Sequence, residues 1–505
     1  MSGTIFSLIP PIVAIALALI TKEVYLSLLI GIMSGAFLFT GPNPLHAVET
    51  MIAIMGEKIG GNVNILLFLA FLGIVVALIT KSGASKAYGE WASHAIRTKK
   101  GALFATMFLG MLIFVDDYFN CLTVGTVMRP VTDKHKITRA KLAYIIDATA
   151  APICIIAPIS SWAAAVNSYV PADAGISGFQ LFLRTIPYNL YAILTIAMVF
   201  YICYTGFDFG QMKLHEDNAA KGDLFTTGGE EFEQVSEQEV NPNGKVIDLV
   251  LPVAVLIVSA IGAMVYTGFL GGADNVISAF AGCDAETSLI FASVVTVLFM
   301  MALYLPRKVI TFKSFMDSLS EGFKLMVPAV TILVFAWTLK GVGDAMGLAQ
   351  FVGSVVGDHA SASIFIPVVL FAVAVFLSFS TGTSWGTFAI LVPIATGMFA
   401  AGTNLEMMII SVSAVLAGAV CGDHISPISD TTVMSSAGAQ SNHLNHVSTQ
   451  MQYAAVTACV CLVGYLIAAV TRTWWITLGV SLLLLLAVLT GMRRFCAKKA
   501  ENGKK

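Results

Sequence analysis

The chain has 505 residues, of which 57% are hydrophobic and only 11% are charged. Soluble domains carry about 25% charged residues, so this composition excludes an ordinary soluble domain and predicts an all-α polytopic membrane protein. The net charge is −2 and the eight cysteines include no CxxC pair, so we expect no disulfide framework, no zinc site and no nucleic acid among the partners.

The first half predicts six apolar segments, since about 20 apolar residues are needed to span a bilayer. They are 5–21, 24–40, 63–80, 102–128, 141–166 and 181–204. A polar, acidic stretch follows, with HEDNAAKGD and GGEEFEQVSEQE, and it predicts a solvated linker. The second half predicts seven segments. They are 249–269, 287–305, 325–342, 361–399, 406–437, 450–470 and 473–492.

Segment 102–128 contains FVDDYFN, two adjacent aspartates within apolar sequence. A carboxylate at the bilayer centre costs about 2.5–3.5 kcal/mol on insertion scales. Another interaction must offset this cost, and we interpret the two aspartates as part of a cation site. Lysines and arginines flank the segment on both sides, which places both flanks in the cytoplasm. A re-entrant hairpin with its tip near Asp116 to Asn120 satisfies this, and one crossing does not.

Segment 361–399 predicts a second hairpin with SFSTGTSWGT at its tip. Its flanks, GVGDAMGLAQ and AAGTNLE, carry no lysine or arginine, which places both outside. The two hairpins therefore enter from opposite sides. We expect two inverted repeats, each with one re-entrant hairpin and one broken transmembrane helix. The expected divisions are a first repeat at 1–205, an acidic cytoplasmic linker at 206–247, a second repeat at 248–470 and an extra helix with a cytoplasmic tail at 471–505.

The broken helices are indicated by AAPICIIAPISSW (150–162) and GAVCGDHISPISDT (418–431), which share a Pro-Ile-Ser core. The prolines Pro158 and Pro427 each follow an earlier proline, Pro130 or Pro393, at a similar spacing. Proline interrupts a helix within the membrane. Two interrupted segments at corresponding positions of opposed halves are the best pointer in a sequence to a transport site.

The candidate residues are polar side chains at the two tips and the two breaks. We predict that ions or substrate bind at Asp116, Asp117, Asn120, Thr123, Asp147, Ser160, Thr381, Thr383, Ser384, Asp423, Ser426, Ser429 and Asp430. Carboxylate and neutral oxygens together suit sodium. The predicted sodium ligands are Asp117, Asn120, Thr383, Ser384 and Asp430.

Several neighbouring residues have two interpretations. His424 is either structural or a modulator of the site. The stretch NHLNH (442–446) predicts a loop or helix-capping role, with pH sensing as the alternative. Trp162 and Trp385 either pack in the core or wall an organic substrate.

Burial and a neighbouring carboxylate both favour the protonated form of a carboxylic acid, whereas sodium favours the ionised form. One site that holds either ion couples their opposite movements. Only one of Asp116 and Asp117 need face the site, because neighbours on a helix point about 100° apart. The alternative is a sodium-coupled symporter of an amino acid or a similar small solute, whose ammonium group would pair with an aspartate.

Three stretches carry a resemblance. GTSWGTFAILVP (382–393), GDHISPISDTTVMSS (422–436) and NHVSTQMQYA (445–454) resemble the NhaC-type sodium/proton antiporter family. The resemblance implies inverted repeats with hairpins, and Na+ and H+ as coupling ions. By motif position, it implies a pathway lined by Thr383, Ser384, Asp423, Ser426, Ser429 and Asp430. His424 stands where members often have asparagine, and the family also contains carriers of organic solutes.

We therefore predict a secondary active transporter that is not an enzyme. It exchanges sodium for protons by alternating access at a carboxylate site that the two ions share, and the alternative is the symporter above. We expect a multi-pass protein of a prokaryotic inner membrane. Sodium is the expected coupling ion, with no other cofactor. A homodimer is a further expectation.

Overall fold

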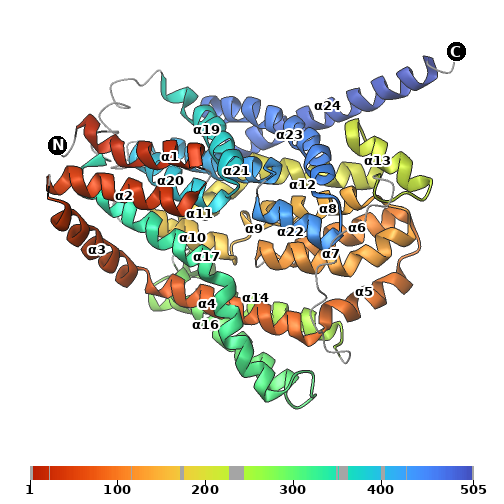
Figure 1. Cartoon of the computed structure of the whole chain (residues 1–505), viewed down its shortest axis with the longest axis horizontal. Coiled ribbons are helices and arrows are strands. Elements are labelled where there is room, and N and C mark those ends of the chain that lie inside the picture. The colour runs from red at the N-terminus through yellow and green to blue at the C-terminus, as the bar shows by residue number, and fades with distance from the viewer. Residues whose placement is uncertain are drawn as a thin grey trace.

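The computed structural model describes residues 4–502, except 22, 42, 115, 171–175, 227–243, 282, 349–350, 352–361, 400–403 and 428. Within these ranges all regular structure is helical, and the helices form one elongated bundle (Figure 1). This confirms the all-α fold class that the composition predicts.

The first half contains helices from the N-terminus to the predicted linker. They are α1 (Ile9–Thr21), α2 (Val24–Thr40), α3 (Pro44–Gly61), α4 (Val63–Ser82), α5 (Ala84–Ala95), α6 (Lys99–Leu112), α7 (Asp117–Lys134), α8 (Arg139–Ala148), α9 (Ala151–Cys154), α10 (Ser161–Tyr169), α11 (Gly178–Thr185), α12 (Leu190–Thr205) and α13 (Gly210–Ala220). Short 3-10 turns lie at Ile5–Leu8 and Ile186–Tyr188.

The second half continues from the linker to the C-terminus. Its helices are α14 (Ile247–Leu270), α15 (Val276–Ala281), α16 (Ala285–Tyr304), α17 (Phe312–Ala345), α19 (Ile366–Thr381), α20 (Ser384–Gly397), α21 (Leu405–Ile425), α22 (Asp430–Ala439), α23 (His443–Thr471) and α24 (Trp474–Asn502). A 3-10 turn at Ala362–Phe365 precedes α19.

Among the described residues, seven helices are long and apolar enough to cross a membrane, and the number is up to nine if each of two bent pairs forms one span. The short helices α19 and α20 fall below the length of a full crossing, as expected for the arms of a hairpin. The chain is a multi-pass membrane protein.

Both hairpins lie where the sequence predicts them. Helices α6 and α7 are joined by residues 113–116, and α19 and α20 by residues 382–383. Gly382 turns the second tip with φ of +68°, a conformation that glycine adopts without strain. In Figure 1, α6 and α7 lie toward the right end of the molecule and α19 and α20 toward the left. This opposed placement matches the predicted inverted repeats.

The two breaks also fall at the predicted prolines. In the first half the chain leaves α9 and re-enters helix at α10, with Pro158 in residues 155–160 between them. In the second half, residues 426–429 separate α21 from α22 and include Pro427. The other two prolines, Pro130 and Pro393, lie inside α7 and α20, the second arms of the two hairpins. The matched proline spacing therefore reflects a matched structure.

The halves meet where α7 crosses α22. Gly125 and Gly438 face each other there, and a Cβ atom built on Gly125 would lie 2.4 Å from the Gly438 carbonyl carbon. No side chain fits in that space, so the two helix backbones approach closely only because both residues are glycine. This crossing brings the first hairpin against the second broken helix.

Three polar helices lie outside the predicted segments, as does the short helix α15. Helix α3 carries Glu49, Glu57 and Lys58 and turns by 115° from α2, and α5 is likewise polar. Helix α13 begins inside the predicted acidic linker. The apolar-run criterion does not detect polar helices, because they have no continuous run of about 20 apolar residues.

Helix α13 is fixed to the bundle by buried charges. Lys141 of α8 is 1% exposed, and its Nζ lies 2.7 Å from Asp208 Oδ2 and 3.6 Å from Glu216 Oε2. Lys99 pairs with the same Glu216 at 2.6 Å, and Tyr453 donates to Asp208 Oδ1 at 2.9 Å. The first part of the predicted linker is thus ordered. Residues 227–243, which hold GGEEFEQVSEQE, lie outside the described residues.

Candidate ion-binding site

The first hairpin tip is held together by Asn120. Its Nδ2 lies within hydrogen-bonding distance of three carbonyl oxygens, those of Gly110 (2.6 Å), Ile113 (3.0 Å) and Thr149 (3.1 Å). The amide thereby closes the C-terminal end of α6, whose last carbonyls have no partner within the helix. Its Oδ1 is buried and has no hydrogen-bond partner among the described residues. Because the three contacts involve only Nδ2, Oδ1 of Asn120 remains available as a ligand.

Asp117 begins α7 at the same tip. It is 2% exposed, and its Oδ1 has no hydrogen-bond partner in the described part of the chain. Its electrostatic neighbours include Asp116, Trp162 and Asp423, the last from the other half. Asp116 is also buried, and its carbonyl accepts from the backbone N–H of Asn120 at 3.1 Å. The adjacent aspartates therefore lie at a buried helix start, where the helix dipole stabilises negative charge.

Asp423 lies in the last turn of α21, just before the second break. It is 5% exposed, and Ser384 at the start of α20 donates to its Oδ2 at 2.7 Å. Its Oδ1 is buried without a hydrogen-bond partner in the described ranges. The second hairpin tip thus supplies one donor to this carboxylate and leaves its other oxygen available.

Asp147 lies in the last turn of α8 and is 1% exposed. Both hydrogen-bond donors to its Oδ2 come from the second half, Thr432 of α22 at 3.1 Å and Gln450 of α23 at 2.6 Å. Its Oδ1 is buried with no such partner among the residues described. Thr432 and Gln450 are neighbours of this candidate residue that sequence reasoning missed, because nothing in one sequence links positions 285 and 303 residues apart.

Aromatic side chains separate the two tips. The rings of Trp162 and Trp385 lie 5.8 Å apart edge to face, and Phe388 contacts both. Both indole N–H groups are buried; that of Trp385 has no hydrogen-bond partner in the described chain, whereas that of Trp162 lies close to the Asp117 carboxylate. Indole nitrogen only donates, so these groups are suited to an anion and not to a cation.

Three of the seven predicted hydroxyl residues cap helices. Ser160, Thr383 and Ser429 are the N-cap residues of α10, α20 and α22, and each accepts from a backbone N–H there. Two more bond to carbonyls, Thr381 to Leu377 at 2.9 Å and Ser426 to Phe379 at 2.7 Å. The three caps satisfy backbone groups of their own helix starts, as is usual for serine and threonine, whereas Ser426 bonds to α19, 47 residues earlier in the chain. A ligand role for these five residues stays a prediction.

Three other predicted residues have distinct environments. Thr123 is buried on α7, one turn after the tip. Asp430 begins α22 and is exposed, unlike the other aspartates of the set. His424 is buried, with its Nδ1 2.7 Å from the Tyr191 hydroxyl, whereas its Nε2 has no hydrogen-bond partner among the described residues.

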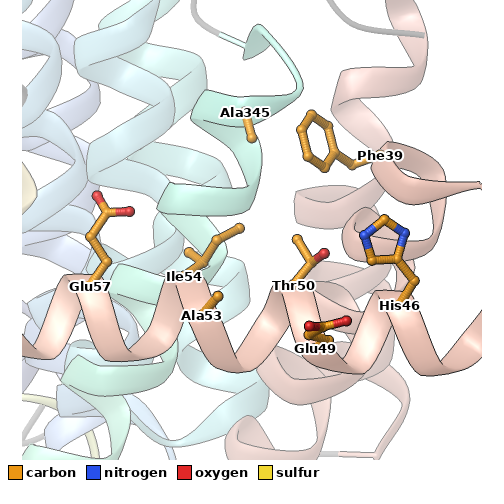
Figure 2. Close-up of a pocket in the computed structure, with 8 residues that line it drawn as sticks. All are labelled: Phe39, His46, Glu49, Thr50, Ala53, Ile54, Glu57 and Ala345. Carbon is orange, nitrogen blue, oxygen red and sulfur yellow. The ribbon is translucent and has the colours of Figure 1, made fainter.

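A surface pocket of about 390 Å³ lies elsewhere, between α2, α3 and the end of α17 (Figure 2). Its lining includes Phe39, His46, Glu49 and Ala345 but none of the predicted ion-binding residues. The candidate site is instead enclosed by packed side chains. Among the described residues, no three His, Cys, Asp or Glu side chains form a metal-binding group. The oxygens gathered here suit a weakly held alkali cation better than a tightly held transition metal.

Comparison with known proteins identifies the family. The model of the Na+/H+ antiporter family matches residues 164–470. The chain belongs to the Na+/H+ antiporter family. This confirms the resemblance found in the sequence, and it makes the chain a secondary transporter with sodium as the implied coupling ion.

Individual relatives agree with this. The chain is 37% identical over 494 residues to an uncharacterised protein of Haemophilus influenzae, covering 93% of this chain and 92% of that one. It is 32% identical to the malate-2H+/Na+-lactate antiporter of Bacillus subtilis over 151 residues, 30% of this chain and 31% of the relative. A match of similar extent is an uncharacterised Na+/H+ antiporter of Haemophilus influenzae, 32% identical over 137 residues, which are 26% of this chain and 28% of the relative.

A solved structure shows the same fold. The YdaH transporter of Alcanivorax borkumensis superposes with a TM-score of 0.57 over 86% of this chain and 90% of that chain. The sequence identity is 14%, so the likeness concerns the fold alone.

Proposed function

We propose that the chain exchanges Na+ for H+ across the inner membrane of a prokaryote, by alternating access at a site that holds either ion. The observation that carries the proposal is the set of buried oxygens without hydrogen-bond partners at the first tip and beside the two breaks. These are Oδ1 of Asp117, Asn120, Asp147 and Asp423. A buried carboxylate is costly unless a cation or a proton compensates it.

The hydrogen-bond geometry supports a shared site. Asp147 and Asp423 each accept hydrogen bonds on Oδ2 only, which leaves Oδ1 as a cation ligand when ionised or as the protonated oxygen when neutral. Sodium requires the first state and a proton creates the second. One ion therefore excludes the other. Asp430 is exposed, so the proposal rests on the buried aspartates.

In this proposal the two halves of the chain move relative to each other during transport. We assign the opposed repeats to 1–205 and 248–470, with 206–247 as a cytoplasmic connection and 471–505 as an added helix and tail. Lys99, Arg139 and Lys141 lie at one end of the bundle with α13, and an excess of such residues marks the cytoplasmic side. Contacts of Asp147 with the second half give the site a direct connection to movement between the halves.

The second candidate is a carrier that also moves a small organic anion or amino acid with sodium. The indole N–H group of Trp385 favours it, because it is buried without a partner among the described residues and could donate to a substrate carboxylate. The malate and lactate named for the Bacillus subtilis relative are organic anions of this kind.

The test uses the full chain reconstituted in liposomes under an inward sodium gradient, with a pH dye in the lumen. Antiport makes the lumen alkaline without any organic solute. Asp117→Asn abolishes the signal, whereas Asp217→Asn, on the exposed face of α13, preserves it. A silent wild type that accumulates labelled lactate, malate or amino acid only with sodium would reject antiport and establish the second candidate.

A further inference from the structure

Three side chains between α22 and α23 form a hydrogen-bonded row that the proposed ion site does not use. Ser436 Oγ lies 3.1 Å from His443 Nδ1 and 2.9 Å from His446 Nδ1. His443 is partly exposed, and its Nε2 lies 2.7 Å from the Pro427 carbonyl oxygen. His446 is fully buried one turn further along α23. The row therefore leads from the surface into the core.

Gln450 fixes the hydrogen positions at the inner end. Its Nε2 donates to Asp147 Oδ2 and to the His424 carbonyl, two groups that only accept. Its Oε1 must then accept from His446 Nε2–H, at 2.8 Å. The same His446 Nε2 is 3.9 Å from Asp147 Oδ2. Movement by about 1 Å would bring this pair into hydrogen-bonding range.

The row satisfies two protonation states of His446. When Ser436 donates to His446 Nδ1, the ring is neutral and both of its nitrogens have partners. When Ser436 donates instead to the Thr432 carbonyl at 2.8 Å, its oxygen accepts from His446 Nδ1–H and the ring is a cation. A rotation of one hydroxyl converts one arrangement into the other. A buried histidine with partners in both states can take up and release a proton.

The outer end faces the basic end of the molecule. Arg139 donates to the Ala439 carbonyl at the end of α22, and Asn445 donates to the Phe225 carbonyl in the segment after α13. Titratable and charged groups also face the row from the packed helices. They are Cys121 from α7 (which contacts the neighbouring Ser435), Arg139 and Asp147 from α8, and His424 from α21.

We propose that His443, Ser436 and His446 form a proton path between cytoplasmic water and Asp147. This rests on the proposed antiport function. Protonated His443 gives its Nδ1 proton to Ser436 Oγ as the serine proton passes to His446 Nδ1. His446 then releases its Nε2 proton to Asp147 Oδ2, and rotation of the carboxylic acid group carries that proton to the position of the oxygen without hydrogen-bond partners. His443 regains a proton from water. His446 returns to its starting tautomer when Nδ1 gives up one proton and Nε2 takes up another, so the number of protons on the ring is unchanged. One proton moves inward and no other bond changes.

The test compares two reactions of the same liposomes, Na+/H+ exchange and ²²Na+/Na+ counterflow. Counterflow requires the sodium site and the moving halves but no proton. We expect His443→Ala and Ser436→Ala to slow Na+/H+ exchange about tenfold or more and to leave counterflow at the wild-type rate. Ser436→Thr keeps the hydroxyl and restores exchange. The matched control is Ser448→Ala, on an exposed position of α23.

The remaining outcomes reject the path. Wild-type exchange in both alanine variants would show that protons reach Asp147 by another route. Equal loss of exchange and counterflow would show that the residues act only through structure. If the wild type shows counterflow but moves no protons, the antiport proposal itself fails, and the path fails with it.

Discussion

The two buried aspartates beside the breaks have similar burial but opposite kinds of partner. Asp423 is bonded by Ser384, a residue of its own half, at the adjacent hairpin tip. Asp147 is bonded by Thr432 and Gln450, which both belong to the other half. A bond within one half persists when the halves move against each other, whereas a bond between halves changes. We therefore propose that Asp423 responds to the bound ligand and Asp147 to the relative position of the halves.

The strongest test of this comparison removes each charge in turn. We expect Asp147→Asn and Asp423→Asn each to lower Na+/H+ exchange in liposomes by about 100-fold or more, because neither amide can exchange a proton for sodium. Expression and thermal stability should stay close to the wild type. If either variant exchanges at the wild-type rate, that aspartate is not part of the shared site.

A substitution where α7 crosses α22 should have a smaller effect, and this effect is on the free energy of unfolding. Gly125→Ala should lower the free energy of unfolding by about 1–3 kcal/mol, since its Cβ would overlap the Gly438 backbone. Gly262→Ala, in open space on α14, should instead raise it by about 0.4–1 kcal/mol. Thermal unfolding in detergent measures both. Equal melting temperatures for the two variants would contradict the close approach of α7 and α22.

The smallest expected effect comes from removing one hydrogen bond to each aspartate, and it distinguishes the role of Asp147 from that of Asp423. Thr432→Val removes one bond between the halves and Ser384→Ala one bond within a half. One such bond contributes about 1 kcal/mol, or roughly a fivefold change in an equilibrium. We expect Thr432→Val to change the maximal exchange rate and Ser384→Ala to change the sodium concentration for half-maximal rate. The reverse assignment would show that Asp147 does not report on conformation.

The sequence predicts the frame of the site well, for local reasons. The polar stretches FVDDYFN and TGTSWGT identify both hairpin tips, and Pro158 and Pro427 identify both breaks. Each signal lies within a few residues of the feature that it predicts. Lysine and arginine counts around the hairpins predict that they enter from opposite sides, because orientation follows charge in the adjacent loops, and this orientation stays a prediction.

Partners distant in sequence could not be predicted in this way. Asn120 was proposed as a ligand, but its triple contact with α6 and Thr149 becomes visible only in three dimensions. His446 and Gln450 look like residues of a polar helix start and are core neighbours of Asp147. Similarly, the acidic residues after Gly206 predict a solvated linker, yet Asp208 and Glu216 neutralise the buried Lys141.

The buried charge cluster of Lys141, Asp208 and Glu216 has a consequence for folding during translation. Lys141 finds its counter-charge Asp208 only 67 residues later, so the first half can bury this lysine before the second half is translated. Asp147, in contrast, receives its hydrogen bond from Gln450 only after 303 further residues have been translated. At 5–20 residues per second the ribosome needs about 15–60 s to reach it. During that interval Lys141 already has its counter-charge Asp208, whereas Asp147 still lacks its hydrogen-bond donors, so the arrival of α23 supplies the last donor to Asp147.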